Sequence, residues 1–182
     1  IGCVVVTMDS FQYLSKVHRR QPFFLKENQI DSWIKHDNCN IIFEPGRAII
    51  GNTALLVAKV QYLKKGSNKT FAILNAGMND FMRTALYDAV HNILPVIKNS
   101  KKNNGPLEFV GPICETTCKF IKYKKYQKIN QSDHVAIADV GAYGASLSSN
   151  YNTKPLIAEI IINKSKKRII RKKQNLKNLI NQ

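Results

Sequence analysis

The sequence predicts an α+β fold in which a mostly antiparallel β domain, residues 48–182, follows the last part of an incomplete (β/α)₈ barrel, residues 1–47. Past residue 47, short apolar runs rich in β-branched residues recur between turn signals, which is typical of an antiparallel sheet. Before it, the apolar run 41–43 ends in the polar loop 44–47, as buried barrel strands do at their catalytic edge. A complete barrel needs about 250 residues, so the 182 residues can hold only its end.

The elements follow in order. The run 41–43 is an expected strand, and a helix is expected before it over residues 26–34. Further strands are expected over 55–63, 71–74, 107–113, 135–140, 156–162 and 168–171. One helix, residues 80–93, interrupts them because its apolar residues recur at i, i+3 and i+4, and Pro95 stops it. A short return helix over 175–182 closes the chain.

The chain is strongly basic, with a net charge of +16 and a pI near 9.8. A clustered basic surface is the usual footprint of nucleic-acid binding. Here, however, Lys, Ile and Asn together make up about a third of the chain, which is typical of A+T-rich coding sequence, and most lysines are scattered. Only residues 164–173 form a basic cluster, and no nucleic-acid motif accompanies it, so we expect no nucleic-acid partner.

The cysteines and the apolar runs point to a cytoplasmic protein. Residues 1–6 are too short for the apolar core of a signal peptide, and no run is long enough to span a membrane, so no membrane partner is expected. Four cysteines without a secretory signal indicate reduced thiols. The spacing of Cys114 and Cys118 does not fit a zinc site and the four histidines are isolated, so no metal site is predicted.

Four segments resemble one known family in order and approximate spacing: 44–47 (EPGR), 78–87 (MND followed by RTALY), 111–116 (GPICET), and 141–152 (GAYG followed by SSNYN). Over about residues 40–180 the chain resembles the diaminopimelate decarboxylases, members of the alanine-racemase-like group of pyridoxal-phosphate enzymes. The resemblance implies a carboxy-lyase that converts meso-diaminopimelate to L-lysine, the last step of lysine biosynthesis, with pyridoxal 5'-phosphate as cofactor. It also implies a C-terminal β domain of the alanine-racemase type and a homodimer.

The cofactor residues implied by the resemblance are Glu44, Gly46, Arg47 and Tyr143. Glu44 would pair with the pyridinium nitrogen, Gly46 and Arg47 would hold the phosphate or the substrate carboxylate, and the Tyr143 hydroxyl would reach the cofactor phosphate and the substrate. From the residues alone, a glycine before an arginine allows close backbone approach beside a guanidinium clamp. The alternatives are a strand-ending turn with a surface ion pair and a tyrosine packed on the core.

The substrate residues implied are Arg83, Tyr87 and Glu115. Arg83 and Tyr87 lie four apart, so a helix presents both on one side, and the resemblance assigns them the carboxylate and amino groups of the substrate. The alternative is the solvated edge of an amphipathic helix. Thr84 replaces the family's usual proline, which we expect to loosen the helix start slightly.

Cys114 and Glu115 are the candidates for donating a proton and for binding the distal end of the substrate. A thiol with a pKa of about 8.5 can donate a proton at neutral pH, and a carboxylate can bind an ammonium group. The resemblance implies that Cys114 is the proton donor, that Glu115 reads the distal ammonium, and that both serve the other subunit's site. The alternative for Cys114 is a small core residue. Thr117 and Cys118 replace the usual Gly-Asp, so this loop must form without the conformational freedom of a glycine.

The family's cofactor lysine and ring-stacking histidine belong to earlier barrel strands, and no lysine here is assigned that role. Cys3 and Val4 occupy the positions of two glycines that cradle phosphate in the family. Three hypotheses stay open: the C-terminal part of the enzyme, active when joined to its barrel half; a truncated, non-catalytic remnant with the β domain and dimer surface; and a basic binding protein. The reading frame upstream of Ile1 distinguishes the first two.

Overall fold

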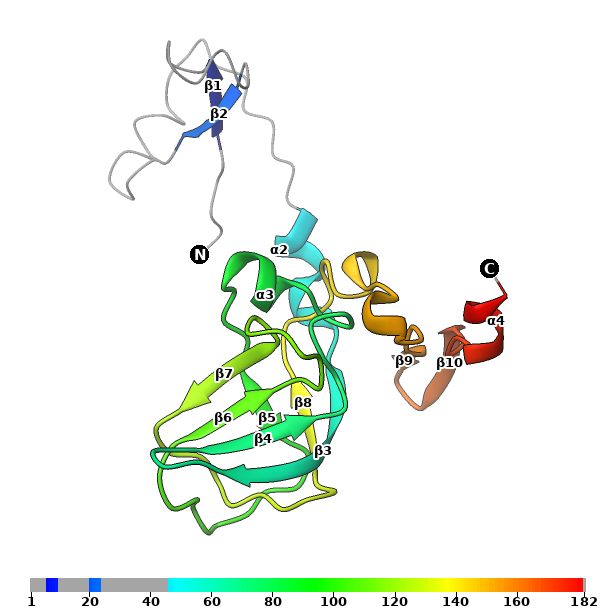
Figure 1. Ribbon diagram of the computed structural model, residues 1–182. Helices are drawn as coiled ribbons and strands as arrows, with labels where there is room; N and C mark the ends of the chain where they lie inside the picture. Colours follow the sequence, from blue (N-terminus) through cyan, green and yellow to red (C-terminus); the bar gives the residue numbers. More distant parts are fainter. Residues whose placement is uncertain (1–5, 10–19, 24–45, 182) are drawn as a thin grey trace. The chain divides into compact units, whose positions relative to one another are not determined.

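A computed structural model describes residues 6–9, 20–23 and 46–181, and the chain divides into two compact units, residues 1–48 and 49–182 (Figure 1). In the first unit β1 (Val6–Asp9) and β2 (Arg20–Phe23) pair antiparallel. Helix α2 (Gly46–Ile50) crosses the border. The helix expected over 26–34, the strand expected over 41–43, and Cys3, Val4 and Glu44 lie outside the described residues.

The second unit is built on one six-stranded sheet in the order β5-β8-β3-β4-β6-β7. Its strands are β3 (Leu56–Lys65), β4 (Thr70–Leu74), β5 (Ile93–Pro95), β6 (Leu107–Val110), β7 (Lys119–Tyr123) and β8 (His134–Ile137). Every neighbouring pair is antiparallel except β4 and β6, which run parallel. The prediction of a mostly antiparallel β domain is therefore confirmed.

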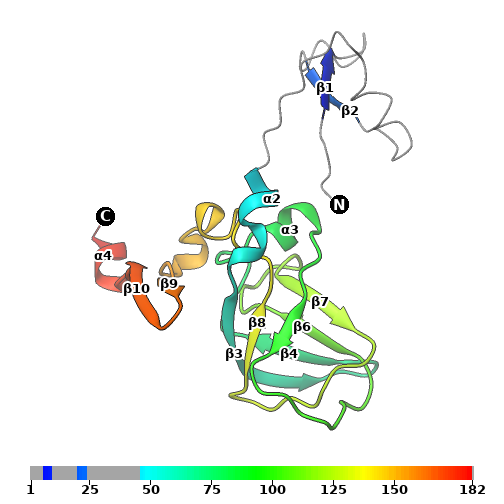
Figure 2. The same cartoon turned by 180° about the vertical axis from the view of Figure 1, so that it is seen from behind.

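The sheet curls around its core, as Figures 1 and 2 show. In the first half of β3 alternate residues point inward, and Val60 is completely buried. Side chains from β7 and the loop after it reach the opposite edge. The Tyr123 hydroxyl accepts a hydrogen bond from the Ile93 backbone N–H at 2.8 Å, and the Tyr126 hydroxyl donates to the Ile93 carbonyl at 3.0 Å. Both tyrosine rings also pack near Phe109, so the edges are joined through a shared aromatic cluster.

Short helical segments and a hairpin complete this unit. The 3₁₀ turns η1 (Gly51–Thr53), η2 (Ala145–Leu147) and η3 (Tyr151–Thr153) flank the sheet in sequence. Strands β9 (Glu159–Asn163) and β10 (Lys166–Arg171) form an antiparallel hairpin, followed by α4 (Leu176–Ile180). The expected return helix over 175–182 is confirmed at this position. The Asn175 side chain caps it by accepting a hydrogen bond from the Lys177 N–H at 3.0 Å.

The expected helix over 80–93 is wrong in length. Helix α3 covers only Arg83–Tyr87 and ends at Asp88, which adopts a left-handed conformation with φ 49°. Ile93 instead pairs with Ile137 in the sheet and is buried, while Val90 of the supposed apolar face is 78% exposed. The spacing was helical, but strand pairing with β8 determined the structure. Within the described ranges, no helix is long and apolar enough to cross a membrane.

Candidate functional site

Three of the predicted site residues lie together beside α3. The guanidinium carbon of Arg83 is 5.7 Å from the centre of the Tyr87 ring and 5.6 Å from that of the Tyr143 ring. Both distances fall within the range of a cation–π contact. Tyr87 and Tyr143 are exposed and Arg83 is half-buried, so the two phenol side chains are accessible to a ligand. The group formed by Arg83, Tyr87 and Tyr143 is called the arginine cluster below.

His91 supports this cluster, although no sequence pattern indicated it. Its Nε2 lies 3.5 Å from the Arg83 Nε, and its Nδ1 lies 2.9 Å from the Ala138 carbonyl. A neutral ring with its proton on Nδ1 satisfies both contacts, since Nδ1 then donates to the carbonyl and Nε2 accepts from the guanidinium. The His91 ring is buried and packs edge-on against Phe81 at 4.6 Å. Arg83 is thus backed by a residue eight positions further along the chain.

Tyr143 is positioned by its backbone. It adopts a left-handed conformation with φ 61°, which is uncommon for a residue other than glycine. The turn is closely packed: the Gly141 N–H donates to the Gly51 carbonyl at 2.9 Å, and a Cβ at Gly141 would lie 2.8 Å from the Thr53 Oγ1. A Cβ at Gly144 would collide with the Val140 carbonyl oxygen. The glycines on either side of Tyr143 are therefore required by the turn itself.

Cys114 and Glu115 lie on the loop that joins β6 to β7, and both are exposed. The loop is closed by hydrogen bonds from the Gly111 N–H to the Cys118 carbonyl at 2.8 Å and from the Cys118 N–H to the Glu115 carbonyl at 3.0 Å. The alternative of a small core residue is wrong for Cys114, because its side chain faces solvent. A solvent-accessible thiol can exchange its proton, and the adjacent carboxylate can accept an ammonium group.

The two departures in this loop are accommodated. Thr117 is not among the residues with positive φ, so the loop forms without a glycine at this position. Cys118 is buried, and its Sγ accepts a hydrogen bond from the Met78 N–H at 3.4 Å. It also fills the space above Gly111, where a Cβ would meet the Cys118 sulfur. The loop is therefore anchored to residues 77–81.

Residues 77–81 connect this loop to the arginine cluster. The Gly77 N–H donates to the Asp80 carboxylate at 2.9 Å, and the Asn79 carbonyl accepts from the Ser149 N–H at 2.9 Å. Burial raises the pKa of Asp80 above its usual value, although the Gly77 hydrogen bond and Lys154 oppose that rise. Among the buried side-chain nitrogen and oxygen atoms of the described residues, only the Asn79 Oδ1 has no hydrogen-bond partner. The Asp80 side chain thus holds the backbone of residues 77–80, and the Asn79 carbonyl ties this segment to Ser149.

Glu115 has a partner that no sequence pattern indicated. The Tyr151 hydroxyl, 36 positions away, donates a hydrogen bond to the Glu115 Oε1 at 2.5 Å. This hydrogen bond and the negative charge of Glu115 raise the pKa of Tyr151 above its ordinary value. Ionising the phenol would break the bond and place a second negative charge beside the carboxylate. Tyr151 lies within the segment that carried the resemblance, but neither its spacing nor its neighbours suggested a role.

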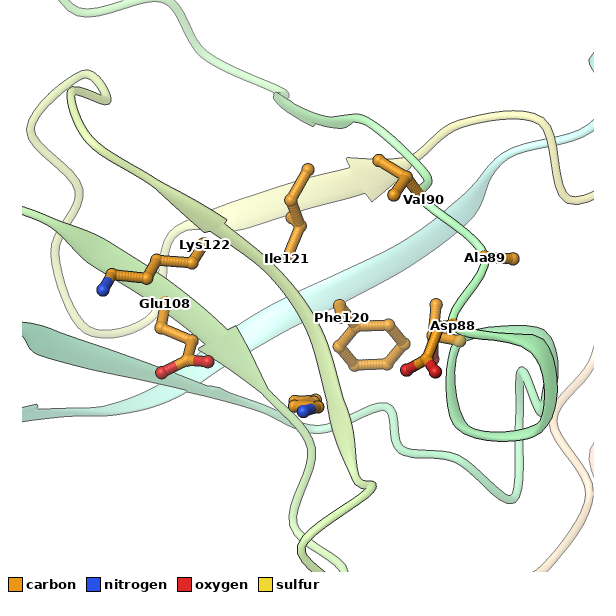
Figure 3. Close-up of a pocket in the computed structure, with 9 residues that line it drawn as sticks. Asp88, Ala89, Val90, Glu108, Phe120, Ile121 and Lys122 are labelled. Atoms are coloured by element: carbon orange, nitrogen blue, oxygen red, sulfur yellow. The ribbon is translucent and has the colours of Figure 1, made fainter.

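The remaining predicted residues lie at the start of α2. Gly46 and Arg47 are both exposed, and nothing lies within 4 Å of where a Cβ on Gly46 would stand. A cavity of about 270 Å³ opens elsewhere, between the turn after α3, with Asp88, and strands β6 and β7, with Phe120 (Figure 3). None of the predicted site residues lines it. Among the residues the structure describes, no group of three or more His, Cys, Asp or Glu could hold a metal ion.

Known proteins match both the sequence and the fold. The model of the pyridoxal-dependent decarboxylase C-terminal sheet domain matches residues 5–141. Diaminopimelate decarboxylase from Haemophilus influenzae is 42% identical over 139 residues, covering 76% of this chain and 33% of that protein. The enzyme from Vibrio cholerae is 38% identical over 159 residues, covering 87% of this chain and 38% of its own length.

Solved structures agree with these relatives. Diaminopimelate decarboxylase from Helicobacter pylori, complexed with L-lysine, superposes with a TM-score of 0.72 and 36% identity over 90% of this chain and 41% of that one. The enzyme from M. jannaschii, also with L-lysine, gives a TM-score of 0.73 and 31% identity over 84% of this chain and 35% of that one. The chain spans about a third of the length of the first curated relatives. Because the family model spans more than half of its residues, the chain belongs to the pyridoxal-dependent decarboxylase family, and the relatives named above are diaminopimelate decarboxylases.

Proposed function

We propose that this chain supplies the substrate-binding and proton-donating part of a diaminopimelate decarboxylase site. The observation that carries the proposal is the arginine cluster, in which one guanidinium lies within cation–π distance of two exposed phenol rings. A guanidinium presents a planar fork of N–H donors that matches a carboxylate, and the phenol hydroxyls can bind the neighbouring amino or carboxylate group. Relatives solved with L-lysine support an amino-acid ligand of this size.

The distal end of the substrate is assigned to Glu115 and the proton to Cys114. In meso-diaminopimelate the second amino group is an ammonium ion at neutral pH, and an exposed carboxylate binds it by a charge-assisted hydrogen bond. In the reaction the bond from the α-carbon to its carboxylate breaks, carbon dioxide leaves, and a bond to a proton forms at the same carbon. The exposed Cys114 thiol delivers that proton. In a homodimer, Cys114 and Glu115 would act in the partner's site while the arginine cluster acts in its own.

The residues that would hold pyridoxal phosphate have chemistry that fits it. The open space above Gly46 permits close approach of a phosphate, the exposed Arg47 adds a positive charge, and the exposed Tyr143 adds a hydroxyl donor. Glu44 is proposed to keep the ring nitrogen protonated. When bound, the cofactor takes up the electron pair that the departing carboxylate leaves behind. No lysine of these 182 residues is assigned to the cofactor, and we propose that the lysine belongs to a barrel portion outside them.

The experiment is a chimera in which residues 46–182 replace the matching part of the Helicobacter pylori enzyme. We expect the chimera to bind pyridoxal phosphate and release carbon dioxide from meso-diaminopimelate. Glu115→Gln should raise KM for diaminopimelate and leave cofactor affinity unchanged, since only the distal ammonium loses its partner. Glu159→Gln, on the C-terminal hairpin, is the matched control and should change neither. A folded, cofactor-loaded chimera without activity would contradict the proposal, and an equal loss of cofactor affinity in Glu115→Gln would make Glu115 structural.

The 182-residue chain alone is expected to be inactive, because efficient turnover of this cofactor class runs through a protein lysine that this chain lacks at the site. Purified chain is incubated with pyridoxal phosphate, reduced with borohydride, and mapped by mass spectrometry. Scattered, substoichiometric labelling is expected. A single stoichiometric pyridoxyl-lysine together with carbon dioxide release would show that one of its own lysines serves the cofactor.

A further inference from the structure

Tyr151 is held in place by several independent contacts. Asn150 extends its side-chain amide to the Lys154 carbonyl at 2.8 Å and to the Gln174 side chain at 2.5 Å. The Ser149 N–H donates to the Asn79 carbonyl at 2.9 Å, and the Ser149 hydroxyl accepts from the Tyr151 N–H at 3.4 Å. The short turn η3 is thus fastened on both sides of Tyr151.

The backbone of η3 is also strained. Asn152 and Thr153 have φ of 56° and 57°, two consecutive left-handed residues that are not glycine. For a β-branched threonine this conformation is unfavourable, and it persists only where surrounding contacts enforce it. Such strain concentrates at sites where a side chain must be aimed. The side chain that this turn aims is Tyr151, whose hydroxyl meets Glu115.

We propose that Tyr151 is a positioning residue for the distal end of the substrate, holding the Glu115 carboxylate so that one oxygen faces the incoming ammonium. The inference rests on the proposed function, in which Glu115 binds that ammonium group. A glutamate on an exposed loop samples many rotamers, and fixing it on binding costs conformational entropy. The Tyr151 hydroxyl occupies Oε1 and fixes the side chain beforehand, which leaves Oε2 as the acceptor for the substrate. Preorganisation of this kind strengthens binding without a new contact to the ligand.

The same bond gives selectivity. A carboxylate that the phenol holds in place pairs with an ammonium group by a charge-assisted hydrogen bond, binds an uncharged donor less strongly and repels an acidic side chain. Tyr151 therefore sharpens the preference for a diamino acid, although it does not touch the reacting carbon.

The first test uses the 182-residue chain itself. Tyrosine labelled with carbon-13 at Cζ is titrated by NMR, and Tyr151→Phe identifies the signal. We expect Tyr151 to titrate above its ordinary pKa of about 10 in the parent chain and to return towards that value in Glu115→Gln. Glu159→Gln, with the same charge change on the hairpin, should leave it unmoved. An ordinary pKa for Tyr151 in the parent chain would overturn the inference.

The second test uses the active chimera. Tyr151→Phe, which removes only the hydroxyl, should raise KM for meso-diaminopimelate about tenfold, the factor that corresponds to one weakened hydrogen bond, with kcat changed less than about twofold. Added to Glu115→Gln it should have little further effect, because both changes remove the same interaction. A lower KM in Tyr151→Phe would mean that the phenol competes with the substrate for Glu115. An unchanged KM would mean that the phenol does not contribute to substrate binding. Either result overturns the inference. An inactive parent chimera counts against the proposed function alone, since the NMR titration decides the Tyr151 bond independently.

Discussion

The six-stranded sheet and the β9–β10 hairpin are built from similar apolar runs, yet only the sheet buries them. Phe109, Leu107 and Val60 of the sheet are completely buried, whereas Ile160, Ile162 and Ile169 of the hairpin are more than half exposed. The sheet curls until its edges meet at the tyrosines, so its inner face has partners on every side. The hairpin is a two-stranded ribbon, an arrangement that is marginally stable alone. Alternating β-branched residues thus indicate a strand but not where its stabilisation comes from.

The largest expected effect is a core truncation in the sheet. Phe109→Ala should lower the free energy of unfolding by about 3–5 kcal/mol, because it empties the aromatic cluster that joins the two edges. Ile162→Ala in the hairpin, 74% exposed, should cost less than about 0.5 kcal/mol. Urea unfolding of both variants measures the difference. A hairpin variant as costly as the core variant would show that a second copy covers these isoleucines in solution.

A smaller effect is expected from adding one methyl group to the loop that joins β6 to β7. In Gly111→Ala the new Cβ would stand 2.6 Å from the Gly77 Cα and 2.9 Å from the Ala76 carbonyl oxygen, and we expect a loss of about 1–3 kcal/mol. Ser165→Ala, in the hairpin turn, should change stability by less than about 0.5 kcal/mol. Thermal or urea unfolding reports both. A neutral Gly111→Ala would mean that the loop is not packed on residues 76–77.

Alkaline pH should destabilise the sheet through one of its buried tyrosines. Burial, with Tyr123 adding to it, raises the pKa of Tyr126 well above its unfolded value of about 10. A raised folded pKa means that the folded state holds the proton more tightly, so this stabilisation is fully present below pH of about 10 and is lost as the pH rises beyond it. Urea midpoints between pH 8 and 11 should fall at the upper end. Tyr126→Phe should flatten that fall, while Tyr62→Phe, which alters an exposed ring, should leave it unchanged.

The smallest effect is expected at the hairpin's ion pair. Glu159 and Arg171 lie 2.9 Å apart with about a third of each side chain exposed, so the pair should contribute less than about 1 kcal/mol. Glu159→Gln should lower the unfolding midpoint slightly at low salt, and the difference should vanish at about 1 M salt. A large loss that salt does not screen would show that this pair organises the hairpin.

The sequence correctly predicted strands whose residues do not also fit a helical spacing and whose apolar runs are not interrupted by charged residues. Strands β3, β4, β6 and β8 were expected within a few residues of their observed bounds. Strand β7 was missed because Lys119 and Lys122 interrupt its apolar residues, and β5 because Ile93 fitted the helical spacing equally well. In both cases pairing with a distant strand decided the outcome, and a local pattern carries no information about that partner.

The candidate site shows the same limit. The spacing of Arg83 and Tyr87 correctly predicted a shared helix, and the resemblance pointed to Tyr143, which lies 60 positions away yet stacks on the same guanidinium. Neither spacing nor residue type suggested His91 behind Arg83 or Tyr151 on Glu115. Left-handed backbone occurs at Asp88, before His91, and at Asn152 and Thr153, after Tyr151. Residue type alone does not show which Asp, Asn or Thr of a sequence adopts this conformation.

The parallel pairing of β4 with β6 has a consequence for the order of folding. A parallel pair needs a crossover, and here the connection, residues 75–106, contains both α3 and β5. The β3–β4 hairpin forms from neighbouring residues, whereas the crossover closes only after a long loop has been brought together, at an entropic cost. We therefore expect Arg83 to reach the Tyr143 ring late, after the hairpin has formed. In the reverse direction, opening of this crossover would break the arginine cluster while the β3–β4 hairpin stays paired.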